Sequence, residues 1–126
     1  MHAARNVKKG ETILYVPKDQ IITLELAFAS PVGKRMYEKG LRQRLISPKH
    51  SFLSTFVMQE RRKGTDSKWY SYLDILPKNF SNFPVFFEED DKAWLEGSPF
   101  LEQIKEKIED IKVDYDLICK EVPEYV

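Results

Sequence analysis

The sequence SPFLEQIKEKIEDIKVDYDLICKE, residues 98–121, predicts the longest helix of this protein. Ser98 suits the N-cap and Pro99 the first helical position, while Pro123 ends the pattern. The apolar residues step by three or four positions throughout: Leu101, Ile104, Ile108, Ile111, Tyr115 and Ile118. This stripe predicts a helix of about 33 Å that packs against its own domain. About three heptads of a coiled-coil seam would show the same spacing, and this is the alternative.

The same start and stop signals predict three more helices upstream. They span residues 31–40, 48–64 and 88–97; Ser-Pro pairs start the first two, acidic residues open the third, and glycine ends all three. In the second of them one apolar stripe faces the core: Phe52, Leu53, Phe56 and Val57.

The first third of the chain predicts short β-strands and turns. Thr12–Val16 and Ile21–Leu24 are β-branched and aromatic runs, too short for helices and suited to a partly buried sheet. Gly10 allows a turn before the first run, and Pro17 stops it. The fold class we expect is therefore α+β, with residues 1–30 forming strands and turns and residues 31–126 forming a helical segment, in one compact unit.

The composition is that of an ordinary globular domain. The chain has 126 residues, of which 42% are hydrophobic and 32% charged. No apolar run approaches the ~20 residues that span a bilayer. No charged-then-apolar segment opens the sequence, so we expect an intracellular protein, cytoplasmic or nuclear.

The net charge is zero, but the charges are unevenly distributed. Residues 1–63 carry 13 Lys and Arg against 5 Asp and Glu, whereas residues 64–126 carry 7 against 15. We interpret this as two halves that complement each other across the fold, and a basic face for an acidic partner is the alternative. The zero total argues against nucleic-acid binding through the basic residues Arg42, Arg44, Lys49, Arg61 and Arg62.

Few residues form a recognisable motif for catalysis, metal binding or ligand binding. One cysteine, Cys119, excludes an intrachain disulfide, and His2 and His50 are too few for a metal motif. No glycine-rich phosphate loop is present. The aromatic group Trp69, Tyr70 and Tyr72 suits either a cage for a methylated lysine or, as we favour, core packing. From the residues alone we assign no catalytic, cofactor-binding or metal-binding position.

Four stretches, taken together, resemble a known family. They are ARNVKKGETILYVP (4–17), LELA (24–27), QERRKGTDSKWYSYLDILPKNF (59–80) and FFEEDDKAWLEGSP (86–99). In this order they are similar to SET-domain protein methyltransferases of the subclass typified by the Rubisco large-subunit lysine methyltransferase. The resemblance implies the first strands of a partial SET domain, then a mainly α-helical insertion with one long C-terminal helix.

The resemblance also implies the family's reaction and cofactor. A methyl group passes from S-adenosylmethionine to a lysine ε-nitrogen of a protein substrate, or in some relatives to another side-chain nitrogen, without a metal. A narrow channel aligns amine, methyl and sulfur, so catalysis depends on orientation and electrostatics.

This sequence departs from the family pattern at the reactive positions. It contains no Gly-x-Gly cofactor loop before residue 4, no Asn-His-Ser motif and no segment with the catalytic tyrosine. We therefore expect the N-terminal part of such an enzyme, inactive as this chain alone and without tight S-adenosylmethionine binding. His50, at a helix start that borders the substrate cleft in the family, is the nearest candidate for substrate binding. The alternative is a non-catalytic interaction module that forms a homodimer through exposed apolar surface or the long helix.

Overall fold

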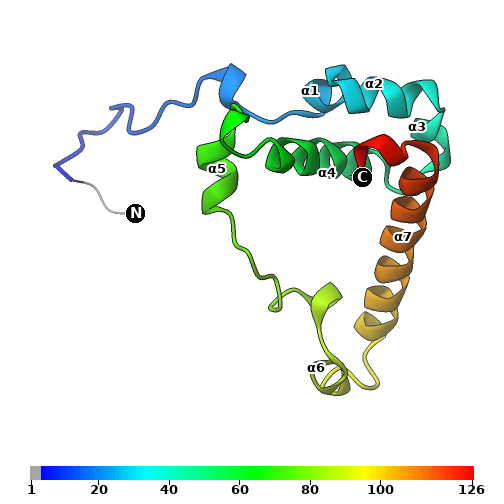
Figure 1. The fold of residues 1–126 in the computed structure, drawn as a ribbon. Coiled ribbons are helices and arrows are strands. Elements are labelled where there is room, and N and C mark those ends of the chain that lie inside the picture. The colour runs from blue at the N-terminus through cyan, green and yellow to red at the C-terminus, as the bar shows by residue number, and fades with distance from the viewer. Residues whose placement is uncertain (1–3) are drawn as a thin grey trace.

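A computed structural model describes residues 4–126, and His2 lies outside the described residues. Its helices are α1 (Leu24–Ala29), α2 (Pro31–Glu38), α3 (Leu41–Arg44), α4 (Pro48–Arg62), α5 (Tyr70–Ile75), α6 (Glu89–Ala93) and α7 (Pro99–Glu121). Short 3-10 turns occupy Lys18–Gln20, Gly64–Asp66, Pro84–Phe86 and Pro123–Tyr125. Figure 1 shows α1 and α2 lying along α4, with α7 rising from α6 to meet α3.

The predicted α+β class is wrong, because no β-strand occurs within residues 4–126. Thr12–Val16 lies in an extended segment that projects from the helices (Figure 1), with Ile13 80% and Tyr15 79% exposed. A strand needs a neighbouring strand to accept its ladder hydrogen bonds, and nothing in the described chain supplies one. The first third of the described chain therefore consists of extended segments and short helices rather than a sheet.

The second predicted strand, Ile21–Leu24, is also wrong. Thr23 instead caps α1, because its hydroxyl accepts a hydrogen bond from the backbone N–H of Leu26 at 3.2 Å. The following residues, Leu24–Ala29, are mostly good helix formers, so once the cap is made the chain continues as a helix.

The helices predicted over residues 31–40, 48–64 and 98–121 are confirmed. The helix predicted over residues 88–97 is shorter, because α6 spans only Glu89–Ala93. Ser30 and Ser98 cap α2 and α7, and proline occupies the first turn of α2, α4 and α7. Gly40 and Gly64 have left-handed backbone, with φ of 68° and 55°, just after α2 and α4. The short helix α3 was not predicted; it occupies a single turn between Gly40 and Leu45.

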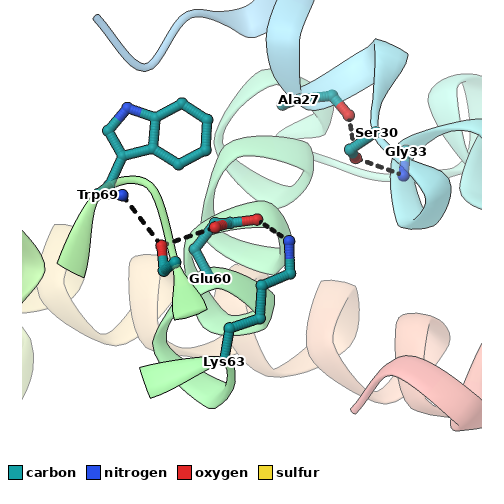
Figure 2. Close-up of polar contacts among 7 residues, drawn as sticks. Ala27, Ser30, Gly33, Glu60, Lys63 and Trp69 are labelled. Carbon is teal, nitrogen blue, oxygen red and sulfur yellow. Dashed lines mark hydrogen bonds and ion pairs between the residues drawn. The ribbon is translucent and has the colours of Figure 1, made fainter. Parts of the chain in front are cut away.

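The core lies where α1–α4 meet the C-terminal end of α7. Its buried members are Ala27, Val32, Met36, Leu41, Leu45, Phe52, Phe56, Ile118 and Val122. Gly33 lets α1 and α2 approach closely, because a Cβ at this position would lie 1.9 Å from the carbonyl oxygen of Ala27. Ser30 joins the two helices by donating to Ala27 O at 2.6 Å and accepting from Gly33 N at 3.0 Å (Figure 2).

The helices leave an unusually large surface in water. The chain has 9950 Å² of accessible surface, whereas a folded monomer of 14.9 kDa has about 7,000 Å². Part of this excess, roughly 3,000 Å² by this scaling, belongs to the extended N-terminal segment, where Ile13, Leu14 and Tyr15 are at least 70% exposed. Within residues 4–126, no helix is both long enough and apolar enough to cross a bilayer.

Candidate functional site

The first candidate site is the junction of α7 with the start of α4. Asp114 of α7 is only 4% exposed and accepts three hydrogen bonds: from Ile46 N at 2.7 Å, Ser47 N at 2.9 Å and Ser51 Oγ at 2.8 Å. A carboxylate at a helix N-terminus also meets the positive end of the helix dipole. This side chain therefore fixes the position and orientation of α7 relative to α4.

A groove of about 470 Å³ opens beside this junction, between α4 and α7. The α4 wall presents Ser51, Ser54, Thr55 and Met58, and the α7 wall presents Ile111, Tyr115 and Ile118. Interaction with the Cys119 side chain, chiefly a hydrogen bond, raises the pKa of Tyr115, so this phenol stays neutral at physiological pH. The groove is thus largely apolar between these walls, although Lys107, Asp110 and Asp114 also line it.

His50, the residue expected to face a substrate, lies exposed at the edge of this groove. The structure brings it near Lys107 and Asp110 of α7, which also line the groove. Among residues 4–126, no cluster of three His, Cys, Asp or Glu side chains could hold a metal ion.

The second candidate site is the C-terminal end of α4, shown in Figure 2. Glu60 is 3% exposed, pairs with the Lys63 ammonium group and accepts a hydrogen bond from Ser67 Oγ at 2.7 Å. Ser67 Oγ in turn accepts from the Trp69 backbone N–H at 3.1 Å. The buried carboxylate is tolerated because Lys63 and Ser67 both bind it and Ser67 in turn accepts from the Trp69 backbone. These linked contacts fix the turn after α4.

This turn orients Trp69 against the core, as the core-packing interpretation predicted for this residue, but that interpretation is wrong for Tyr70 and Tyr72. Its ring meets Phe56 edge-on, with centroids 5.4 Å apart, whereas Tyr70 and Tyr72 are exposed. The Trp69 indole N–H is buried and has no hydrogen-bond partner within the described chain. A second hollow of about 350 Å³ lies beside it, bordered by Pro31, Glu60 and Tyr125 among others.

Neither hollow provides the features of a cofactor cradle. None of the glycines with left-handed backbone, Gly10, Gly40, Gly64 and Gly97, lines either hollow. Gly33 is closed off by Ala27. Neither hollow therefore offers a glycine loop on which backbone could approach a cofactor.

The helical periodicity of the sequence indicates that Asp114 and Glu60 lie on buried faces, although neither was predicted as a site residue. Asp114 falls within the apolar stripe of α7, three residues after Ile111 and four before Ile118, and Glu60 continues the series Phe52 and Phe56 on α4. A charged residue on a buried helix face must have a partner.

Within residues 4–126, three long-range ion pairs join the two halves of the chain, and two of them pair an arginine of the basic half with a glutamate of the acidic half. Arg44 donates to Glu121 at 2.7 Å and Arg35 to Glu124 at 3.3 Å. The Arg44 guanidinium lowers the pKa of Glu121. These contacts favour the interpretation that the two halves complement each other.

Comparison with known proteins identifies relatives of one kind. The ribosomal lysine N-methyltransferase set10 of Schizosaccharomyces pombe is 39% identical over 66 residues, covering 52% of this chain and 12% of that protein. The actin-histidine N-methyltransferase of Homo sapiens is 26% identical over 104 residues, covering 82% and 17%. The chloroplastic ribulose-1,5 bisphosphate carboxylase/oxygenase large subunit N-methyltransferase of Nicotiana tabacum is 29% identical over 99 residues, covering 79% and 18%.

No family model and no solved structure matches the chain. The relatives nevertheless confirm the expected resemblance to protein methyltransferases, including the subclass of the Rubisco large-subunit enzyme. The chain spans less than a fifth of the length of each of these three relatives.

Proposed function

We propose that this chain, a relative of protein methyltransferases, is the N-terminal part of a SET-domain enzyme that transfers a methyl group from S-adenosylmethionine to a protein lysine. The observation that carries the proposal is that relatives named as methyltransferases match most of the chain. The relatives are named for lysine and for histidine substrates, and lysine is our choice because of the QERRKG…KWYSYLDILP pattern at residues 59–77.

The role of this part is to support the reaction rather than to perform it. Asp114 fixes α7 against α4, and the Glu60–Ser67 hydrogen bond fixes the turn that carries Trp69. Orientation of the acceptor nitrogen and the methyl donor accounts for much of the rate in such a transfer, so a rigid frame beneath the channel contributes indirectly. S-adenosylmethionine would supply the methyl group when bound to the whole enzyme. We keep His50 as a proposed contact to the protein substrate, because its exposed position leaves it accessible.

One binding measurement and one activity assay on the isolated chain test this proposal. Calorimetry with S-adenosylmethionine should show no micromolar affinity, and a methylation assay with a protein mixture should show no transfer. Micromolar cofactor affinity or sustained turnover by this chain would contradict its assignment as a part without the reactive residues.

We expect the protein to act inside the cell, in the cytoplasm or nucleus, although the tobacco relative is chloroplastic by name.

A second candidate function is a non-catalytic interaction module that forms a homodimer. The exposed apolar residues of α7, Ile111 and Tyr115, favour it. Size-exclusion chromatography with light scattering tests it: a monomer at low micromolar concentration contradicts a dimerisation module.

A further inference from the structure

We propose that the groove between α4 and α7 is the docking site for an amphipathic helix supplied by the rest of the methyltransferase. This inference rests on the proposed function, since it names the partner that the N-terminal part requires. A helix laid into such a groove would insert its apolar face between Met58 on one wall and Ile111 on the other.

The apolar stripe of α7 is only partly covered by its own chain. Ile104 is 3% and Ile118 is 5% exposed, so both ends of the stripe are buried. Between them Ile111 is 50% and Tyr115 is 49% exposed, and both line the groove. An amphipathic helix packs its whole stripe when its partners are present, so this middle section is where a partner is missing.

The opposite wall is shaped for close approach of a helix. Ser51, Ser54 and Thr55 are short side chains, and the hydroxyls of Ser54 and Thr55 donate to the Ser51 carbonyl oxygen at 3.1 and 2.7 Å. Their donors are thus satisfied before any partner binds, and burying them leaves no donor unpaired.

The groove is also held open by a fixed frame. The three hydrogen bonds to Asp114 join the two helices at one end of the groove. A partner helix therefore does not have to order α4 and α7 when it binds, which lowers the entropic cost of docking.

Two observations favour the rest of the enzyme over a second copy as the occupant. The uncovered part of the α7 stripe extends from Ile111 to Tyr115, whereas a coiled coil between two copies needs several heptads. The matched relatives have more than four fifths of their length outside the match, and the chain exposes roughly 3,000 Å² more than a folded monomer of its mass.

A labelled, stapled amphipathic helix with leucines at positions i, i+4 and i+7 is the probe. We expect saturable fluorescence anisotropy on titration with the chain, and at least a tenfold weaker affinity with Ile111→Glu. Val113→Glu is the matched control, because Val113 is 43% exposed on α7 but does not line the groove. Circular dichroism verifies that both variants keep their helix content.

The possible results test the docking site independently of the proposed methyltransferase function. No saturable binding, or equal weakening by Val113→Glu, overturns the docking site. A dimer that Ile111→Glu converts to a monomer in light scattering assigns the groove to a second copy and overturns it as well. Neither result touches the methyltransferase assignment, which the cofactor and transfer assays test separately.

Discussion

Asp114 and Ser51 lie 63 positions apart in the sequence, yet the carboxylate of Asp114 accepts a hydrogen bond from the Ser51 hydroxyl at 2.8 Å. The same carboxylate binds the backbone N–H groups of Ile46 and Ser47, at the entrance to α4. One buried side chain of the long helix thus determines how the two longest helices meet, and with them the shape of the groove.

Removing this carboxylate should destabilise the protein strongly. Asp114→Ala leaves two backbone N–H groups and one hydroxyl without an acceptor, and we expect the free energy of unfolding to fall by about 3 kcal/mol. Urea denaturation measures the change. Asp116→Ala, at an exposed position of the same helix, should stay within about 0.5 kcal/mol. Equal effects of the two substitutions would contradict the role of Asp114.

The close approach of α1 and α2 should not tolerate a methyl group. Gly33→Ala would place a Cβ 1.9 Å from the Ala27 carbonyl oxygen, and moving the helices apart should cost about 2–3 kcal/mol. Thermal unfolding followed by circular dichroism measures this. Lys34→Ala, exposed on the same helix, is the control. An unchanged melting temperature for Gly33→Ala would show that the helices are not in contact here.

The hydrogen bond between Ser67 and Glu60 should stabilise the turn after α4. Ser67→Ala removes a donor to a buried carboxylate and an acceptor for the Trp69 backbone N–H, so we expect a loss of about 1–3 kcal/mol. Because Trp69 packs on Phe56, its fluorescence should shift to the red in a Trp94→Phe background. Ser71→Ala, at an exposed site, should change neither quantity. A red shift of equal size with Ser71→Ala would refute this role for Ser67.

The pair Arg44–Glu121 should make stability depend on acid pH. The folded-state pKa of Glu121 lies below its ordinary value of 4.5, chiefly through the hydrogen bond from Arg44. The unfolded state therefore binds a proton more readily, so the contribution is present above pH 4.5 and is lost as the pH falls through the lowered folded pKa.

Arg44→Gln should reduce this dependence below pH 4.5 in urea titrations at several pH values. Because both side chains face solvent, added salt should weaken the effect as well. A pH profile identical to that of the unmodified protein would contradict the contribution of the pair.

The local parts of the fold could be predicted from the sequence. The starts of α2 and α7 depend on capping by Ser30 and Ser98, and all of α2, α4 and α7 have proline in the first turn. Such signals act within a few residues. The strands at Thr12–Val16 and Ile21–Leu24 were wrong for the opposite reason. A strand depends on a partner strand distant in sequence, and β-propensity without such a partner leaves extended chain.

The candidate sites were less predictable than the helices. His50 was proposed from the resemblance, in which this helix start borders the substrate cleft. Its position at the groove depends on α7, whose groove-lining residues come about 60 positions later. Asp114 and Glu60 were missed because the partners of Asp114 lie on another helix and those of Glu60 in a turn. The resemblance to methyltransferases came from four ordered motifs taken together, because no single motif was decisive.

The most direct test of the central claim is methyl transfer by a chimaeric enzyme. In it, this chain replaces the matched segment of the tobacco large-subunit methyltransferase, and incorporation of labelled methyl into Rubisco is measured. We predict transfer well above that of the tobacco enzyme without the segment, while the isolated chain transfers none. A chimaera that folds and binds S-adenosylmethionine but transfers no more than the deleted enzyme would contradict the assignment of this chain as the N-terminal part of a methyltransferase.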